Sequence, residues 1–282
     1  MAFPEQAYAL GSEDLIIALR AAEAAGRIVR EAYGEIHESD NVKGFGDVAL
    51  VVDAEADIIL HNTLRALAPG DRILSEETPA TDHDDINGRR WVVDPLDSTT
   101  SMKFAAGESY CSVLAGLQID GVTTVAVAHF PLTSEWFYAV RGGGAYKNGE
   151  KIATDTAPKD LGEVIVDMNH QPADLESAFF SKLWQQLRTP GRGAFRVTSH
   201  FPHSGIAMRI AEAAPWVSAA IHDNSTDKVK QAAWDTVAPA LILEEAGGVY
   251  WNHLGEPYDP WNPTPILAAS TEELARKILA LV

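Results

Sequence analysis

The stretch Trp91-Val92-Val93-Asp94-Pro95-Leu96-Asp97-Ser98-Thr99-Thr100 joins a short apolar run to two carboxylates and three hydroxyls. Its first three residues predict a short buried strand. Pro95 has no N–H to donate and a fixed φ, so we expect it to end the strand and bend the chain. Asp94, Asp97 and the Leu96 carbonyl then offer hard oxygen ligands of the kind that Mg²⁺ prefers.

A helix is expected to begin after Asp97, with the free N–H groups of Ser98 and Thr99 forming an anion site. A single D-x-x-D pattern also has a plainer interpretation, in which Asp97 is a helix N-cap and Asp94 a solvated turn residue. Two further carboxylates favour the metal site. Glu76 follows the apolar pair Ile73-Leu74, which predicts that it lies at the end of another strand, and Asp235 opens a predicted helix.

Taken in order, these fragments closely resemble the inositol monophosphatase superfamily, whose members are Mg²⁺-dependent, lithium-sensitive phosphatases. Several ordered motifs with fitting separations are a more specific signal than one pattern alone. The resemblance covers nearly the whole chain and depends on the segments 46–53, 75–77, 91–100, 142–149 and 234–248.

The resemblance implies two principal metal positions. Glu76, Asp94 and the Leu96 carbonyl would hold the first ion, and Asp94, Asp97 and Asp235 the second. Metal ions in such a site lower the pKa of water and neutralise charge on the phosphoryl group.

The resemblance also implies catalytic and substrate-binding residues. Asp53 matches an aspartate near a weaker third metal position, and Thr99 matches a threonine that orients the attacking water together with Glu76. The expected substrate-binding residues are Ser98, Thr99, His170, Gly205 and Lys228.

Two departures from the family pattern concern the substrate side of the site. Ser98 replaces a glycine, and its N–H can still reach a phosphate if φ is negative there. Lys228 falls at or near a position that holds a glutamate in the inositol enzymes. Lys228 and Lys230 could bind a second phosphate or a carboxylate, or they could be solvated surface residues.

The order of expected elements indicates a layered α/β fold, and the resemblance implies an alternating αβαβα sandwich. We expect an α+β part over residues 1–158 and a closely packed α/β part over 159–282. The glycine-rich segment 43–47 is expected to be a loop, and the turns Asp120-Gly121 and Asn148-Gly149 to join hairpin strands. Ser270 and Glu273 predict a capping box for the last helix. Helices are expected at 12–33, 53–67, 174–187, 204–213 and 231–246. The second of these places the apolar residues Ile58, Leu60, Leu64 and Leu67 near one face.

Composition limits the classes of partner. The 282 residues are 46% hydrophobic and 22% charged, with a formal net charge of −18, which repels nucleic acid and anionic membranes. We therefore expect a phosphorylated small molecule as substrate, with cations inverting the local charge. The single cysteine, Cys111, is expected to be a buried hydrophobic residue in a reducing compartment. The sequence shows neither a signal-peptide pattern nor a membrane span, so a cytoplasmic enzyme is expected.

The expected function is Mg²⁺-dependent hydrolysis of an inositol, cyclitol or sugar phosphate, and the resemblance also implies a homodimer. The same fold allows a nucleotide 3′-phosphatase, a histidinol-phosphate phosphatase or a fructose bisphosphatase, because a fold does not fix a substrate. A metal-binding regulatory protein without turnover is the alternative from another class.

Overall fold

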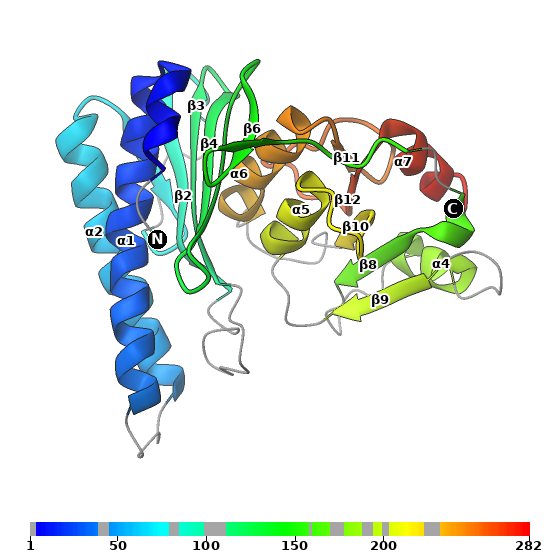
Figure 1. Ribbon diagram of the computed structural model, residues 1–282, viewed down its shortest axis with the longest axis horizontal. Coiled ribbons are helices and arrows are strands. Elements are labelled where there is room, and N and C mark those ends of the chain that lie inside the picture. The colour runs from blue at the N-terminus through cyan, green and yellow to red at the C-terminus, as the bar shows by residue number, and fades with distance from the viewer. Residues whose placement is uncertain are drawn as a thin grey trace.

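The computed structural model is a stack of alternating helical and sheet layers (Figure 1). Within the described residues, no helix is both long and apolar enough to cross a membrane. The structure describes residues 4–38, 45–78, 85–98, 111–157, 160–169, 178–187, 194–198, 203–222 and 232–282.

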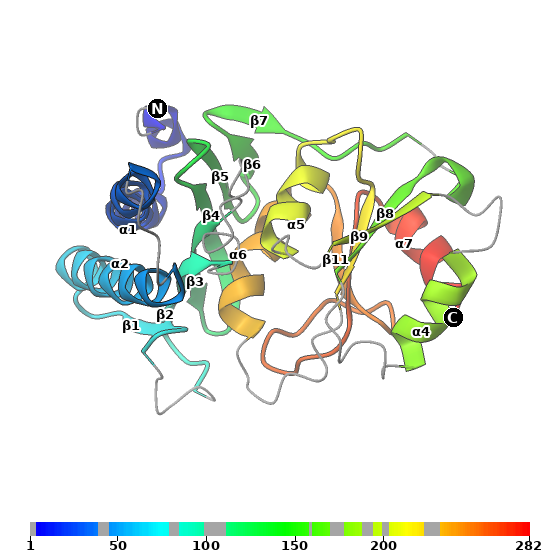
Figure 2. The ribbon, with the colours of Figure 1, turned by 90° about the horizontal axis from the view of Figure 1, so that it is seen from below.

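The outer layer consists of α1 (Glu13–Glu38) and α2 (Phe45–Leu67), after the short 3₁₀ helix η1 (Glu5–Leu10). The spacing of apolar residues in α1 predicted its buried face, and Leu15 and Leu19 are fully buried there. The two helices lie side by side against one face of the first sheet (Figure 2).

Two expectations for α2 are wrong. Residues 45–47 belong to the helix and not to a loop, whereas residues 43 and 44 lie outside the described part of the chain. One glycine costs a helix only about 1 kcal/mol, which packing against α1 can offset. Leu60 and Leu64 are buried, but Ile58 is 58% exposed. The apolar pattern misplaced Ile58 because two buried aspartates, Asp53 and Asp57, take up part of the inward face of α2.

The first sheet has seven strands in chain order. The first two strands are parallel and all the other neighbours are antiparallel, so the sheet is mixed. Both predicted turns join hairpins, and their residues have positive φ. The strands are β1 (Arg72–Ser75), β2 (Arg89–Asp97), β3 (Ser112–Ile119), β4 (Val122–Phe130), β5 (Glu135–Val140), β6 (Gly144–Lys147) and β7 (Glu150–Ile152).

Strand β2 does not end before Pro95, contrary to expectation. The strand continues to Asp97, and its pairing with β3 shifts register between Asp94 and Asp97. A proline is tolerated where a bulge leaves its residue without a ladder hydrogen bond. The irregularity keeps both aspartates on a strand that is otherwise anchored to its neighbour.

The second sheet has the order β11-β12-β10-β8-β9, and strands and helices alternate along the chain as predicted. The expected capping box is wrong, because the N-cap of α7 is Thr271, whose hydroxyl accepts from Leu274 N at 3.1 Å. The elements are η2 (Leu161–Glu163), β8 (Ile165–Asn169), α4 (Ala178–Leu187), β9 (Ala194–Thr198), α5 (His203–Ala211), β10 (Ala219–His222), α6 (Ala232–Glu245), β11 (Val249–Asn252), β12 (Ile266–Ala269) and α7 (Glu272–Leu279).

Helices α5 and α6 form the middle layer, between the two sheets. Their buried apolar side chains pack with Leu114 and Phe137 of the first sheet and with Ile266 of the second. A separate apolar cluster joins the far face of the second sheet to α4 and α7. The order of layers is therefore the αβαβα sandwich that was expected, and the single cysteine, Cys111, is buried within its core.

Gly116 allows α6 to approach the first sheet closely. A Cβ added at this position of β3 would lie 2.6 Å from Cγ1 of Val237 in α6. Such overpacking of a tight core contact is usually destabilising. Since α6 also carries Asp235, this contact fixes how far that residue stands from the sheet.

We predict that Gly116→Ala lowers the free energy of unfolding by about 1 to 3 kcal/mol in urea denaturation, because Val237 must move. Gly70→Ala is the matched control, since a Cβ added at Gly70 would meet no atom within 4 Å. Equal stability of the two variants would contradict the close approach.

Candidate metal centre

Parallel pairing of β1 and β2 brings two carboxylates to one edge of the first sheet. Ser75 pairs with Val93, so the next residues on the two strands, Glu76 and Asp94, lie side by side. The backbone N–H of Glu76 donates to the carbonyl of Val93 at 3.4 Å. The expected position of Glu76, directly after a strand, is confirmed.

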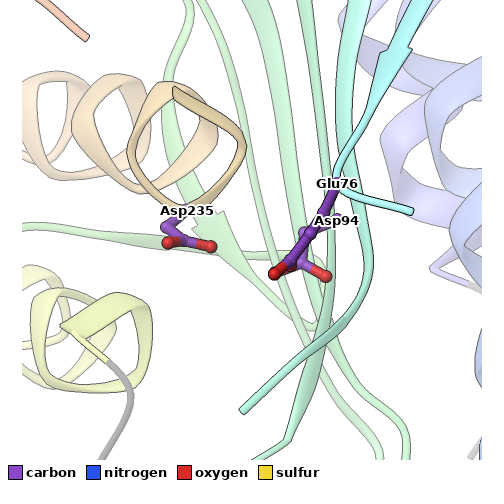
Figure 3. Close-up of side chains that lie close together, drawn as sticks. All are labelled: Glu76, Asp94 and Asp235. Carbon is purple, nitrogen blue, oxygen red and sulfur yellow. The ribbon is translucent and has the colours of Figure 1, made fainter. Parts of the chain in front are cut away.

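Helix α6 supplies the third carboxylate from the middle layer. Asp235 lies in its first turn, and the preceding Trp234 packs with Leu74 of β1 and Val92 of β2. One oxygen from each of Glu76, Asp94 and Asp235 lies within 4.8 Å of the others. Figure 3 shows the side chains from the strands and from the helix turned toward a common point.

Asp94 is the most buried member of this group, with 1% of its surface exposed. Its Oδ1 accepts the N–H of Leu96 at 2.9 Å. Within the described chain, no donor reaches its buried Oδ2. A buried anionic oxygen without a donor is costly unless a cation pairs with it. The donor set therefore fits a hard divalent cation, which prefers carboxylate oxygens.

The carboxylates hold protons more tightly than ordinary acids. Desolvation, with the charges of Asp97 and Glu77, raises the pKa of Glu76 to about 7. Burial and the charges of Glu76, Asp97 and Asp235 raise the pKa of Asp94 well above its usual value. An ordinary acidic surface lacks such shifts, whereas a site built to receive positive charge requires clustered anions.

Asp97 lies beside this group and not within it. Its Oδ2 accepts hydrogen bonds from Ser112 Oγ at 3.0 Å and from Ser204 Oγ at the start of α5. Burial raises the pKa of Asp97 to about 6, although both hydroxyls and the Ser98 N–H lower it. The negative charge of Asp97 still acts on Glu76.

Asp53 reaches the same region from α2. It is buried, and its charge contributes to the raised pKa of Asp94. Carboxylates from α2, from the end of β1, from β2 and from α6 thus gather around Asp94.

Ser98 adopts a left-handed backbone conformation with φ of 67°. The condition under which a serine was expected to substitute for the family glycine, a negative φ, is therefore not met. Gly205 is buried in the first turn of α5, next to Ser204. The expected helix after Asp97, with Thr99, and the residues His170 and Lys228 lie outside the described residues.

Sequence reasoning missed the polar residues that hold these carboxylates. Ser112 and Ser204 contact Asp97, and Asp57 accepts from hydroxyls on both sides of the Glu76 segment. Asp57 has a recognisable signal, since it lies four residues after Asp53 and therefore on the same helix face. The two serines have none, because each meets Asp97 only through the tertiary fold.

The sequence matches a known protein family over nearly its whole length. Residues 11–282 match the model of the inositol monophosphatase family. Histidinol-phosphatase of Chlorobaculum parvum is 27% identical over 252 residues, which are 86% of each chain. Inositol monophosphatase of Mesembryanthemum crystallinum is 30% identical over 259 residues, 88% of each chain.

The fold is also that of a solved relative. The structure of inositol monophosphatase from Anabaena (Nostoc) superposes with a TM-score of 0.75 at 23% identity, covering 95% of this chain and 94% of that one. This chain belongs to the inositol monophosphatase family and is an inositol monophosphatase-like phosphoric monoester hydrolase.

Proposed function

We propose that this enzyme hydrolyses a small cyclitol or sugar phosphate with Mg²⁺. The observation that carries the proposal is the group Glu76, Asp94 and Asp235, in which the buried Oδ2 of Asp94 receives no donor from the described residues. The net charge of −18 supports it further, because an anionic substrate needs local positive charge to approach.

In this proposal Glu76, Asp94 and the Leu96 carbonyl hold one ion, and Asp94, Asp97 and Asp235 hold another. Asp53 would stand near a third, weaker position. Mg²⁺ in such a site activates water and stabilises negative charge on the phosphoryl and leaving oxygens.

The protein's own groups would position the reactants. Glu76, the exposed carboxylate of the group, would orient the attacking water together with Thr99. Asp94 and Asp235 come from different layers, so the substrate's phosphate would lie between the first sheet and α6. The Ser98 turn adjoins this place and would contact the phosphate or the alcohol.

Histidinol phosphate is the second candidate substrate. It is favoured by the similarity to histidinol-phosphatase of Chlorobaculum parvum, which spans most of both chains. Lys228 in place of a hydroxyl-binding glutamate also agrees with a substrate other than inositol phosphate. The expected homodimer and cytoplasmic location stay predictions that size measurement and fractionation can test.

A substrate panel tests the proposed function. Purified enzyme with Mg²⁺ should release phosphate from inositol, sugar or histidinol phosphates, and 3′-phosphonucleotides and fructose bisphosphate complete the set. We predict that Asp94→Asn and Asp235→Asn lower turnover of the best substrate by about 100-fold or more, because the metal interaction supplies several kcal/mol. Near-normal turnover in either variant would refute the metal assignment.

The same two variants should unfold at or above the wild-type temperature in chelator, because each removes repulsion among carboxylates. The Mg²⁺-induced rise in melting temperature should be small in both. Comparing the melting temperature in chelator with the Mg²⁺-induced rise distinguishes loss of metal binding from loss of folding.

In chelator, we predict that stability falls as pH rises from about 5 to about 8. The folded protein keeps a proton on Glu76 up to its pKa of about 7, whereas the unfolded chain releases it near 4.5. The folded state therefore binds more protons in this window, and linkage makes the free energy of unfolding decrease. Thermal melting should show a shallower fall in Glu76→Gln, and an equal slope would contradict the assignment.

The segment that carries Glu76 is held from α2 by Asp57. Ser75 Oγ donates to Asp57 Oδ1 at 2.5 Å, and Thr78 Oγ1 donates to Oδ2 at 2.7 Å. His61 Nε2 lies 3.4 Å from the same Oδ1. The bonded hydroxyls flank Glu76, so the buried carboxylate fixes the backbone on both sides of that residue.

We predict that Asp57→Ala weakens Mg²⁺ binding by about 10-fold or more, since residues that orient metal ligands typically contribute this much. Titration calorimetry with Mg²⁺ measures the change. Glu55→Ala removes an equal charge from an exposed position of α2 and is the matched control. Similar affinities for the two variants would show that Asp57 does not position Glu76.

A further inference from the structure

Two hydroxyl groups converge on one oxygen of Asp97. Ser112 Oγ and Ser204 Oγ both donate to Oδ2, and the two hydroxyl oxygens lie 3.5 Å apart. All three side chains are buried, and Ser204 is only 1% exposed. A carboxylate oxygen has two lone pairs, so these two donors occupy Oδ2. The Ser98 N–H also bonds this carboxylate, so three donors hold Asp97 in one orientation.

The first hydroxyl is fixed by the sheet. Ser112 begins β3 and is the direct strand partner of Asp97, beyond the register shift in β2. Its position relative to Asp97 therefore follows from backbone pairing and not from a flexible side chain.

The second hydroxyl comes from the other part of the molecule and is fixed by charge. Ser204 lies in the first turn of α5, and Arg209 in the same helix bonds both oxygens of Glu135 in β5, at 2.9 and 2.6 Å. Glu135 also pairs with Lys147 of β6 at 2.7 Å. Breaking such a largely buried pair is costly, so α5 cannot move freely along the first sheet.

We propose that Ser204, with Ser112, is a positioning residue that fixes the orientation in which Asp97 would bind the second magnesium ion. The inference rests on the proposed function, because it takes Asp97 as a ligand of that ion. It adds that docking of α5 on the first sheet sets the affinity of the second position. A carboxylate released from both hydroxyls would rotate and lose this orientation.

Mg²⁺ titration calorimetry on the full-length protein tests the inference. In Ser204→Ala one class of sites should lose about 10-fold in affinity, as for other residues that orient metal ligands, while the remaining sites change less than about 2-fold. The Mg²⁺ concentration for half-maximal turnover should rise in parallel, with turnover at saturating Mg²⁺ largely kept. Ser204→Thr retains the hydroxyl and should restore most of the affinity.

Two controls separate positioning from general stability. Ser218→Ala removes another buried serine hydroxyl, from the second part of the chain, and should leave both classes of sites unchanged. In an Asp97→Asn background, Ser204→Ala should cause no further loss of Mg²⁺ affinity, because the two residues act on one site. If Ser204→Ala does not fold, Ser112→Ala should show the same selective loss.

The calorimetric results distinguish failure of this inference from failure of the proposed Mg²⁺-dependent function. Wild-type isotherms without Mg²⁺ binding would overturn the proposed function and the inference with it. Normal wild-type binding with unchanged isotherms in both serine variants would overturn the inference alone. An equal effect of Ser218→Ala, or an undiminished effect of Ser204→Ala in the Asp97→Asn background, would also overturn it.

Discussion

Mutual repulsion of the carboxylates of Glu76, Asp94 and Asp235 is the constraint on which the structure depends. Two unit charges 4 Å apart near a protein surface repel by about 4 kcal/mol, and these oxygens lie within 4.8 Å in a chain of net charge −18. Burial first, and neighbouring charges second, raise the pKa of Glu76 and of Asp94, and a proton held by either carboxyl relieves the repulsion. A fold that keeps such a group must therefore hold each carboxylate, or the segment that carries it, through contacts with the rest of the protein. These contacts must not depend on the cation.

Each layer around the site provides one of these contacts. Helix α2 holds the Glu76 segment through Asp57, the sheet and α5 hold Asp97 through two serines, and Trp234 packs the start of α6 against β1 and β2. Because the supports come from α2, from the first sheet and from both helices of the middle layer, these layers cannot separate without dismantling the centre. The charge pairs of Arg209 and the close approach at Gly116 keep the same interface closed.

Local chemistry explains which features the sequence predicted. Asp120-Gly121 suits the positive φ values of a tight hairpin, and a carboxylate after a short apolar run indicated the strand end that carries Glu76. One error arose where polar groups are buried for the site, because the inward face of α2 carries Asp53 and Asp57 and its apolar pattern therefore misplaced Ile58. Others were local, as where a bulge let β2 continue past Pro95. Ser204 is 107 residues from Asp97, a contact that no local pattern specifies.

The support of Asp97 also bears on substrate choice. A serine in the left-handed region costs of order 1 to 3 kcal/mol and persists only where its surroundings fix it. Ser98 is fixed in this way, because its N–H bonds to Asp97 while two serines hold that carboxylate from the other side. Under the proposed function, its side chain would stand beside the phosphate, where glycine would leave space. Metal binding and substrate recognition would then meet at one turn, and a change at Ser98 would alter recognition without displacing the carboxylates.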